Sequence, residues 1–108
     1  MSELRYFLAE DGKCPFEDWF FTLEVAAAAK VRTYLVRLER GNTSNVKAIG
    51  DGVCECKIDW GPGYRVYFGR DGDALVILLI GGTKQRQQKD IEAAKAFWLD
   101  YKRRRRPN

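Results

Sequence analysis

The sequence predicts an α+β domain, with a small, twisted, antiparallel-rich sheet and helices packed on it in the order β-α-α-β-β-β-α. Residues 4–8, 53–58 and 64–69 alternate between two faces with a period of two, as half-buried strands do. Other segments repeat apolar residues at helical spacing. The chain has 108 residues and is 45% hydrophobic, which suits one domain with its own core. We expect this domain over residues 1–102, followed by a basic tail over residues 103–108.

The N-terminal half predicts two helices after its strand. Pro15 suits the first turn of a helix, and an apolar stripe follows over residues 16–23. A second helix, from about residue 26 to residue 40, has an apolar inner side and ends at Gly41. Its outer face is basic and carries Lys30, Arg32, Arg37 and Arg40.

The C-terminal half predicts a meander of three strands and a terminal helix. Residues 42–52 are rich in Gly, Asn, Thr and Ser, which is typical of a loop. Asp71-Gly72 is typical of a hairpin turn. It leads into residues 74–80, whose continuous apolar run indicates a central strand covered on both faces. Helical spacing returns over residues 87–102. We expect the helices to cover one face of the sheet.

The composition argues against several common chemistries. The chain has no histidine, so it has no Ser-His-Asp or Cys-His apparatus and lacks the commonest metal ligand. Cys54 and Cys56 fall on one apolar strand face without further ligands at suitable spacing. The Gly-rich turn at residues 61–63 lacks the Lys-Ser or Lys-Thr of a P-loop. We therefore expect no metal and no cofactor.

Three cysteines, an odd number, indicate a reducing compartment. The first residues lack the apolar core of a signal peptide, and no apolar run is long enough for a membrane span. These features predict a cytoplasmic protein without membrane association.

The candidate site is a group of basic residues on the predicted sheet. Arg65 and Tyr67 are expected on the outward face of one strand, next to Glu55 and Lys57 on its neighbour. A guanidinium beside a phenol suits a phosphate and a nucleobase. The alternative is a solvated face with ion pairs such as Glu55 with Arg65. Further basic residues follow the last strand: Lys84, Arg86 and Lys89.

Charge is distributed unevenly along the chain. Residues 1–83 carry a balance of −2 and residues 84–108 a balance of +6. Such an asymmetry indicates contact with a polyanion, whereas the alternative is a solubilising tail. The arginines expected to contact phosphates are Arg103, Arg104, Arg105 and Arg106.

Three patterns carry a resemblance to a known family. Residues 50–53 read Gly-Asp-Gly-Val, residues 59–68 read Asp-x-Gly-Pro-Gly-Tyr-Arg-Val-Tyr-Phe, and residues 84–91 read Lys-x-x-Gln-x-x-Asp-Ile. The segment over residues 14–23, CPFEDWFFTL, adds a Pro-Phe-x-x-Trp helix start. Together they resemble the phage-type addiction-module killer proteins, which are HigB-like toxins of the RelE/ParE superfamily. The resemblance spans nearly the whole chain and implies the RelE-like fold.

The resemblance also implies a function. Toxins of this type belong to two-gene toxin–antitoxin modules, and many cut mRNA in the ribosomal A site without a metal, through attack by the RNA's own 2′-hydroxyl. Carried over to this chain, Arg65 contacts the scissile phosphate, Lys57 and Lys84 supply neighbouring positive charge, and Tyr101 is the aromatic of the terminal helix. The implied partners are a helix-turn-helix antitoxin and mRNA on the ribosome. Expected RNA contacts are Tyr67, Arg86, Lys89 and residues 103–106.

Two alternatives belong to other classes of function. ParE-like relatives inhibit DNA gyrase and cut nothing, and a domain of this fold can also bind RNA without cleaving it. Some HigB-type nucleases use a histidine, which this chain lacks.

Overall fold

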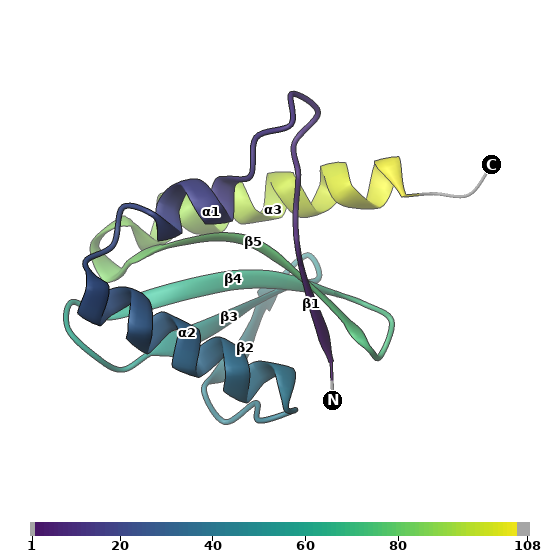
Figure 1. Cartoon of the computed structure of the whole chain (residues 1–108). Coiled ribbons are helices and arrows are strands. Elements are labelled where there is room, and N and C mark those ends of the chain that lie inside the picture. Colours follow the sequence, from purple (N-terminus) through teal and green to yellow (C-terminus); the bar gives the residue numbers. More distant parts are fainter. Residues whose placement is uncertain (1, 106–108) are drawn as a thin grey trace.

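The computed structural model describes residues 2–105 and shows an α+β fold built on one five-stranded mixed sheet (Figure 1). The strand order is β1-β5-β4-β3-β2, with β1 parallel to β5 and the other neighbours antiparallel. The strands are β1 (Glu3–Tyr6), β2 (Val46–Gly50), β3 (Val53–Ile58), β4 (Tyr64–Asp71) and β5 (Leu75–Thr83). The helices are α1 (Pro15–Phe20), α2 (Val25–Glu39) and α3 (Gln87–Arg104), and a 3₁₀ turn (Lys84–Arg86) precedes α3.

The segment predicted as a loop contains a strand, so the observed order is β-α-α-β-β-β-β-α. Strand β2 pairs with β3 through a tight hairpin, whose residues Gly50, Asp51 and Gly52 have φ angles of 101°, 56° and 83°. Left-handed backbone of this kind favours glycine. The glycines that suggested a loop therefore form the turn, and the register shift between Ala48 and Gly50 hid the alternation of the strand.

The prediction that helices cover one face of the sheet is wrong, because they cover both. Helices α1 and α2 enclose a core that includes Phe16, Val31 and Leu38. Helix α3 covers the opposite face, where Trp98 packs with Tyr67. The two layers of helix are visible on either side of the sheet in Figure 1. Strand β5 is buried between them, as its continuous apolar run predicts.

Close contact between α3 and the sheet depends on glycine. A Cβ built on Gly69 would lie 2.4 Å from the ring of Trp98, and one built on Gly52 would lie 2.7 Å from its Nε1. Neither position has room for a methyl group. The two glycines thus let the Trp98 indole pack directly on the backbone, and this contact fixes α3 across β4.

Helix α3 extends two residues beyond its predicted end at residue 102, to Arg104. Arg104 donates to the carbonyl oxygen of Leu8 and lies 3.0 Å from Asp100 Oδ2. Arg105 Nε lies 3.6 Å from Asp71 Oδ2. The first residues assigned to a tail therefore belong to the folded domain, whereas Arg106 lies outside the described residues. Within residues 2–105 no helix is long and apolar enough to cross a bilayer.

Candidate functional site

Strand register places the predicted basic residues on one face of the sheet. Lys57 of β3 lies opposite Arg65 of β4, and Glu55 lies opposite Tyr67. Lys47 of the unpredicted strand β2 lies opposite Glu55 from the other side. This is the face that α3 covers, and α3 contacts β5, β4 and β3. Lys47 of β2 and Lys57 of β3 are nevertheless exposed at this end of the sheet.

Arg65 is held tightly, with only 6% of its surface exposed. Its Nη1 donates to the carbonyl oxygen of Gly63 at 2.7 Å, and its Nε lies 3.7 Å from Glu55 Oε2. Gly63 has a φ of 78°, and a Cβ built there would lie 3.3 Å from Nη1. The turn that precedes β4 thus folds back on the guanidinium, which fixes the side chain before any ligand arrives.

Glu55 is the acidic partner in a cluster formed by Lys47, Glu55, Lys57 and Arg65, and it is 2% exposed. Gln87, at the start of α3, donates through Nε2 to Glu55 Oε2 at 2.8 Å. Lys47 Nζ lies 3.8 Å from Glu55 Oε1. A carboxylate this deeply buried is stable only when cations and hydrogen-bond donors surround it. Glu55 therefore joins three strands and one helix at a single point.

A cleft of about 320 Å³ opens beside this cluster. Its lining residues are Ser44, Asn45, Val46, Lys47, Glu55, Lys57 and Arg65. Three cations and one carboxylate face a space of this size, which suits an anion such as a phosphate more than an apolar ligand. Its four lining residues from positions 44–47 were missed in the sequence, because the Gly, Asn, Thr and Ser residues of this segment predicted a loop.

Tyr67 is not available for stacking on a base, which corrects the expectation that it is exposed beside Arg65. The residue is fully buried under α3, and burial raises the pKa of its phenol. Its Oη has no hydrogen-bond partner among the described residues. Alternation along β4 correctly placed Tyr67 and Arg65 on one face, but the sequence did not show that a helix covers most of that face.

The basic residues after β5 lie in two places. A Cβ built on Gly63 would lie 3.8 Å from Lys84 Cβ, so Lys84 stands next to the turn that holds Arg65. Arg86 lines a separate cavity with Asp90, whereas Lys89 lies with Arg86 on an exposed surface. All three are exposed.

Tyr101 lies far from Arg65, at the opposite end of β4. Its hydroxyl donates to Asp71 Oδ2 at 2.7 Å. Burial and this hydrogen bond raise the pKa of Tyr101. Asp71 ends β4, whereas Arg65 is the second residue of that strand. The structure therefore does not bring Tyr101 into the Arg65 cleft.

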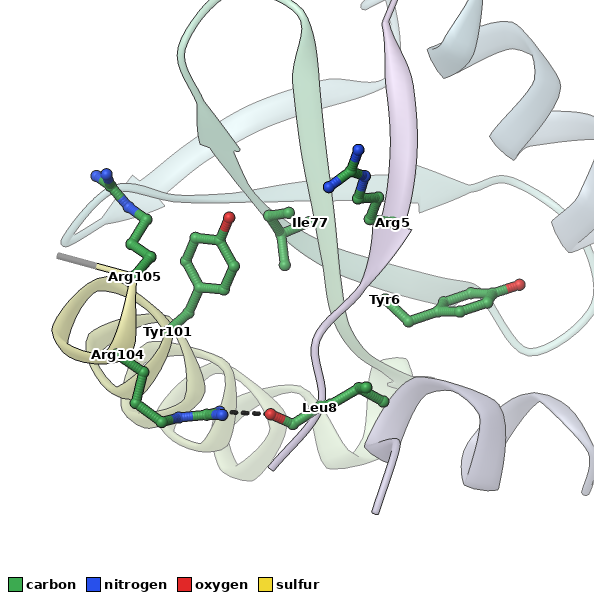
Figure 2. Close-up of a pocket in the computed structure, with 7 residues that line it drawn as sticks. All are labelled: Arg5, Tyr6, Leu8, Ile77, Tyr101, Arg104 and Arg105. Atoms are coloured by element: carbon green, nitrogen blue, oxygen red, sulfur yellow. Dashed lines mark hydrogen bonds between the residues drawn. The ribbon is translucent and has the colours of Figure 1, made fainter. Parts of the chain in front are cut away.

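A second basic cavity, of about 330 Å³, surrounds Tyr101 between β1 and the end of α3 (Figure 2). Arg5, Arg104 and Arg105 line it, but each guanidinium already lies next to a carboxylate. Arg103 is exposed nearby along the same helix. The predicted phosphate contacts at Arg104 and Arg105 are thus engaged within the domain.

The structure is thus that of a small α+β protein with a cleft at one edge of its sheet, lined by three cationic side chains and one carboxylate. No family model matches the sequence. A protein of Haemophilus influenzae described as an uncharacterized protein is 44% identical over 81 residues, which are 74% of this chain and 82% of that protein. The chain belongs to the same family as that Haemophilus protein.

Proposed function

We propose that this chain is a HigB-like toxin of the RelE/ParE superfamily that cleaves mRNA on the ribosome. The observation that carries the proposal is the cleft in which Arg65 is fixed by Glu55 and Gly63, with Lys47 and Lys57 exposed at its rim. A fixed guanidinium in a partly dry site stabilises developing negative charge without having to reorganise. The sequence patterns described above, which resemble those of HigB-like toxins, support the same assignment.

In the proposed reaction the 2′-oxygen of one ribose attacks the adjacent phosphorus. The 2′-hydroxyl proton passes to the Glu55 carboxylate, which is the acidic group that lines the cleft. The bond from phosphorus to the 5′-oxygen breaks, and the ammonium of Lys57 returns a proton to that oxygen. Arg65 neutralises the charge that gathers on the phosphoryl oxygens. The products are a 2′,3′-cyclic phosphate and a free 5′-hydroxyl, so no external oxidant, metal or water is consumed.

A second candidate function is RNA binding without cleavage. Arg65 is 6% exposed and Glu55 is 2% exposed, a degree of burial that also suits an ion pair with a purely structural role. In this candidate the exposed lysines bind phosphates, and Arg65 and Glu55 only connect the strands.

The proposal includes an antitoxin that covers the toxin until it is needed. Helix α2 offers a docking face, because Arg32 lies over the ring of Phe20 and Arg37 over that of Tyr34, both on the outside of the domain. Val25 and Phe21, which are 89% and 74% exposed, add apolar surface nearby. A helix-turn-helix antitoxin with an acidic segment fits this face.

The function is tested in a translating bacterial lysate supplied with the purified chain and a defined mRNA. We expect mRNA fragments that end in 2′,3′-cyclic phosphate, at positions within translated codons, and only while ribosomes are active. Intact mRNA with co-sedimentation of the chain and ribosomes would support the non-cleaving alternative. If plasmid DNA and gyrase are added, intact mRNA together with double-strand breaks in the plasmid would instead indicate a ParE-like inhibitor.

A further inference from the structure

A separate cavity lies one strand away from Arg65, at the end of β5. It measures about 220 Å³ and is lined by Trp19, Ile80, Gly81, Gly82, Thr83, Arg86 and Asp90. Gly82 is the register partner of Arg65, so their Cα atoms are about 5 Å apart across the ladder. The cavity therefore lies on the strand next to Arg65, whereas the cleft that Arg65 lines opens toward β3 and β2.

Asp90 gives this cavity its chemistry. It is 5% exposed, and its Oδ2 is fully buried with no hydrogen-bond partner among the described residues. Desolvation raises the pKa of this carboxyl, and the charge of Arg86 partly opposes that effect. A position in the first turn of α3 explains an acidic residue, since carboxylates there favour the helix dipole. It does not explain a carboxylate that is buried and unpaired, which destabilises the fold.

The side chains of Asp90 and Trp19 pack directly against the backbone of β5. A Cβ built on Gly82 would lie 1.8 Å from Asp90 Oδ2, and one built on Gly81 would lie 2.2 Å from the Trp19 ring. Strand β1 pairs with β5 only as far as Leu78. The edge of β5 that β1 leaves uncovered therefore offers backbone polar groups, between an aromatic wall and an acidic one.

We propose that this cavity binds a guanine base and selects the nucleotide next to the phosphate held by Arg65. Guanine presents two adjacent N–H donors, N1 and N2, to a carboxylate, and its O6 accepts from a backbone N–H. Adenine and uracil lack this pair of donors. Trp19 supplies an apolar wall for the ring, and the cavity is below the roughly 300–1,000 Å³ that holds drug-sized ligands. The inference rests on the proposed function, because that function makes RNA the ligand.

The test is an NMR titration of the full ¹⁵N-labelled chain with guanosine, inosine and adenosine monophosphates. We expect guanosine monophosphate to shift the amide signals of Gly81 and Gly82 and the indole N–H of Trp19. Inosine monophosphate lacks the 2-amino group and should bind about tenfold to a hundredfold more weakly. Asp90→Asn should abolish the difference, whereas Glu92→Gln, an exposed carboxylate of the same helix, should retain it.

Several results would overturn the guanine site. The three nucleotides binding alike, or none of them shifting these signals, would do so. So would N-acetylarginine amide shifting them at lower concentration than guanosine monophosphate, because the cavity would then be an arginine pocket for a protein partner. The cleavage assay separates the two proposals. Cleavage without guanine selectivity refutes only the cavity, and guanine selectivity without cleavage refutes only the nuclease.

Discussion

At the scale of single residues, the candidate site and its surroundings contain buried polar side chains, three of which have an atom without a hydrogen-bond partner within residues 2–105. Arg65 Nε and Tyr67 Oη have no hydrogen-bond partner among the described residues, and neither has Asp90 Oδ2. Arg65 and Tyr67 lie on the sheet face that α3 covers, and Asp90 lies in the first turn of α3 itself. Buried polar groups without partners cost free energy.

Tyr67→Phe tests whether the phenol has any role at the site. Because Tyr67 is buried under α3 with an unpartnered hydroxyl, its removal should leave cleavage unchanged. The free energy of unfolding should stay level or rise by up to about 1–3 kcal/mol, the cost of an unsatisfied buried group. Urea unfolding and the lysate assay measure the two effects. A large loss of cleavage in a stable Tyr67→Phe protein would show that the Tyr67 hydroxyl contributes to cleavage.

Asp90→Asn should change how stability depends on pH. The folded state raises the pKa of Asp90, so it binds the proton more tightly than the unfolded chain does. The contribution of Asp90 to stability is therefore complete below its unfolded pKa of about 3.9 and is lost as pH rises through its folded pKa. Asp90→Asn should be more stable than the wild type at pH 7.

The stability gained by Asp90→Asn should shrink as the pH falls toward 4. Glu92→Gln, which changes an exposed residue on the same helix, serves as the control. Thermal unfolding at several pH values measures both variants. An Asp90→Asn protein less stable than the wild type at pH 7 would show that the carboxylate has a stabilising partner.

At the scale of helices and strands, the local sequence pattern predicted which residues share a face, whereas tertiary contacts determined whether that face is open. Alternation placed Lys57, Glu55, Arg65 and Tyr67 on one face, and the register confirms that they share it. Whether that face is open depends on where α3 docks, and α3 docks through contacts between Trp98 and glycines distant in sequence. Periodicity within one segment carries no information about such a contact. Strand β2 was missed because it is short and irregular in register, and because Gly, Asn, Thr, Ser and Asp residues surround it.

Gly69→Ala should weaken the attachment of α3. The new Cβ would lie 2.4 Å from the Trp98 ring, so the helix must shift or the strand must bend. Overpacking of this kind typically costs about 1–3 kcal/mol. Gly72→Ala is the control, since a Cβ there meets nothing within 4 Å and any loss reflects its φ of 73° alone. Equal stability of the two variants in urea would mean that Trp98 is not seated as described.

At the scale of the whole molecule, the positive charge has a definite location. Two arginines of the basic C-terminal quarter are engaged within the domain, because Arg104 and Arg105 contact Asp100 and Asp71. The exposed lysines at the cleft, Lys47 and Lys57, lie instead on β2 and β3. The RNA-binding surface is therefore expected at the edge of the sheet rather than at the end of the chain.

Salt dependence of binding tests this location. For single-stranded RNA, each lost phosphate contact should reduce the slope of log K against log salt by about 0.7. The double variant Lys47→Gln/Lys57→Gln should show this reduction for two contacts. Lys13→Gln/Lys30→Gln removes the same charge from exposed positions outside the cleft and should leave the slope nearly unchanged. Equal effects of the two pairs would show that RNA responds only to net charge.

The most direct test of the central claim is the rate of mRNA cleavage on ribosomes by Arg65→Gln and Arg65→Lys, with Arg70→Gln as the matched control. Arg70 lies on the same strand, exposed over the ring of Phe68 and away from the cleft. If Arg65 stabilises the phosphoryl charge, Arg65→Gln should lose about 10²–10³-fold in rate. Arg65→Lys keeps the charge beside Glu55 and should fold, yet recover little because the planar fork is lost. Arg70→Gln should cleave at the wild-type rate. Full cleavage by a folded Arg65→Lys or Arg65→Gln protein would contradict the account and leave Arg65 as a structural ion pair.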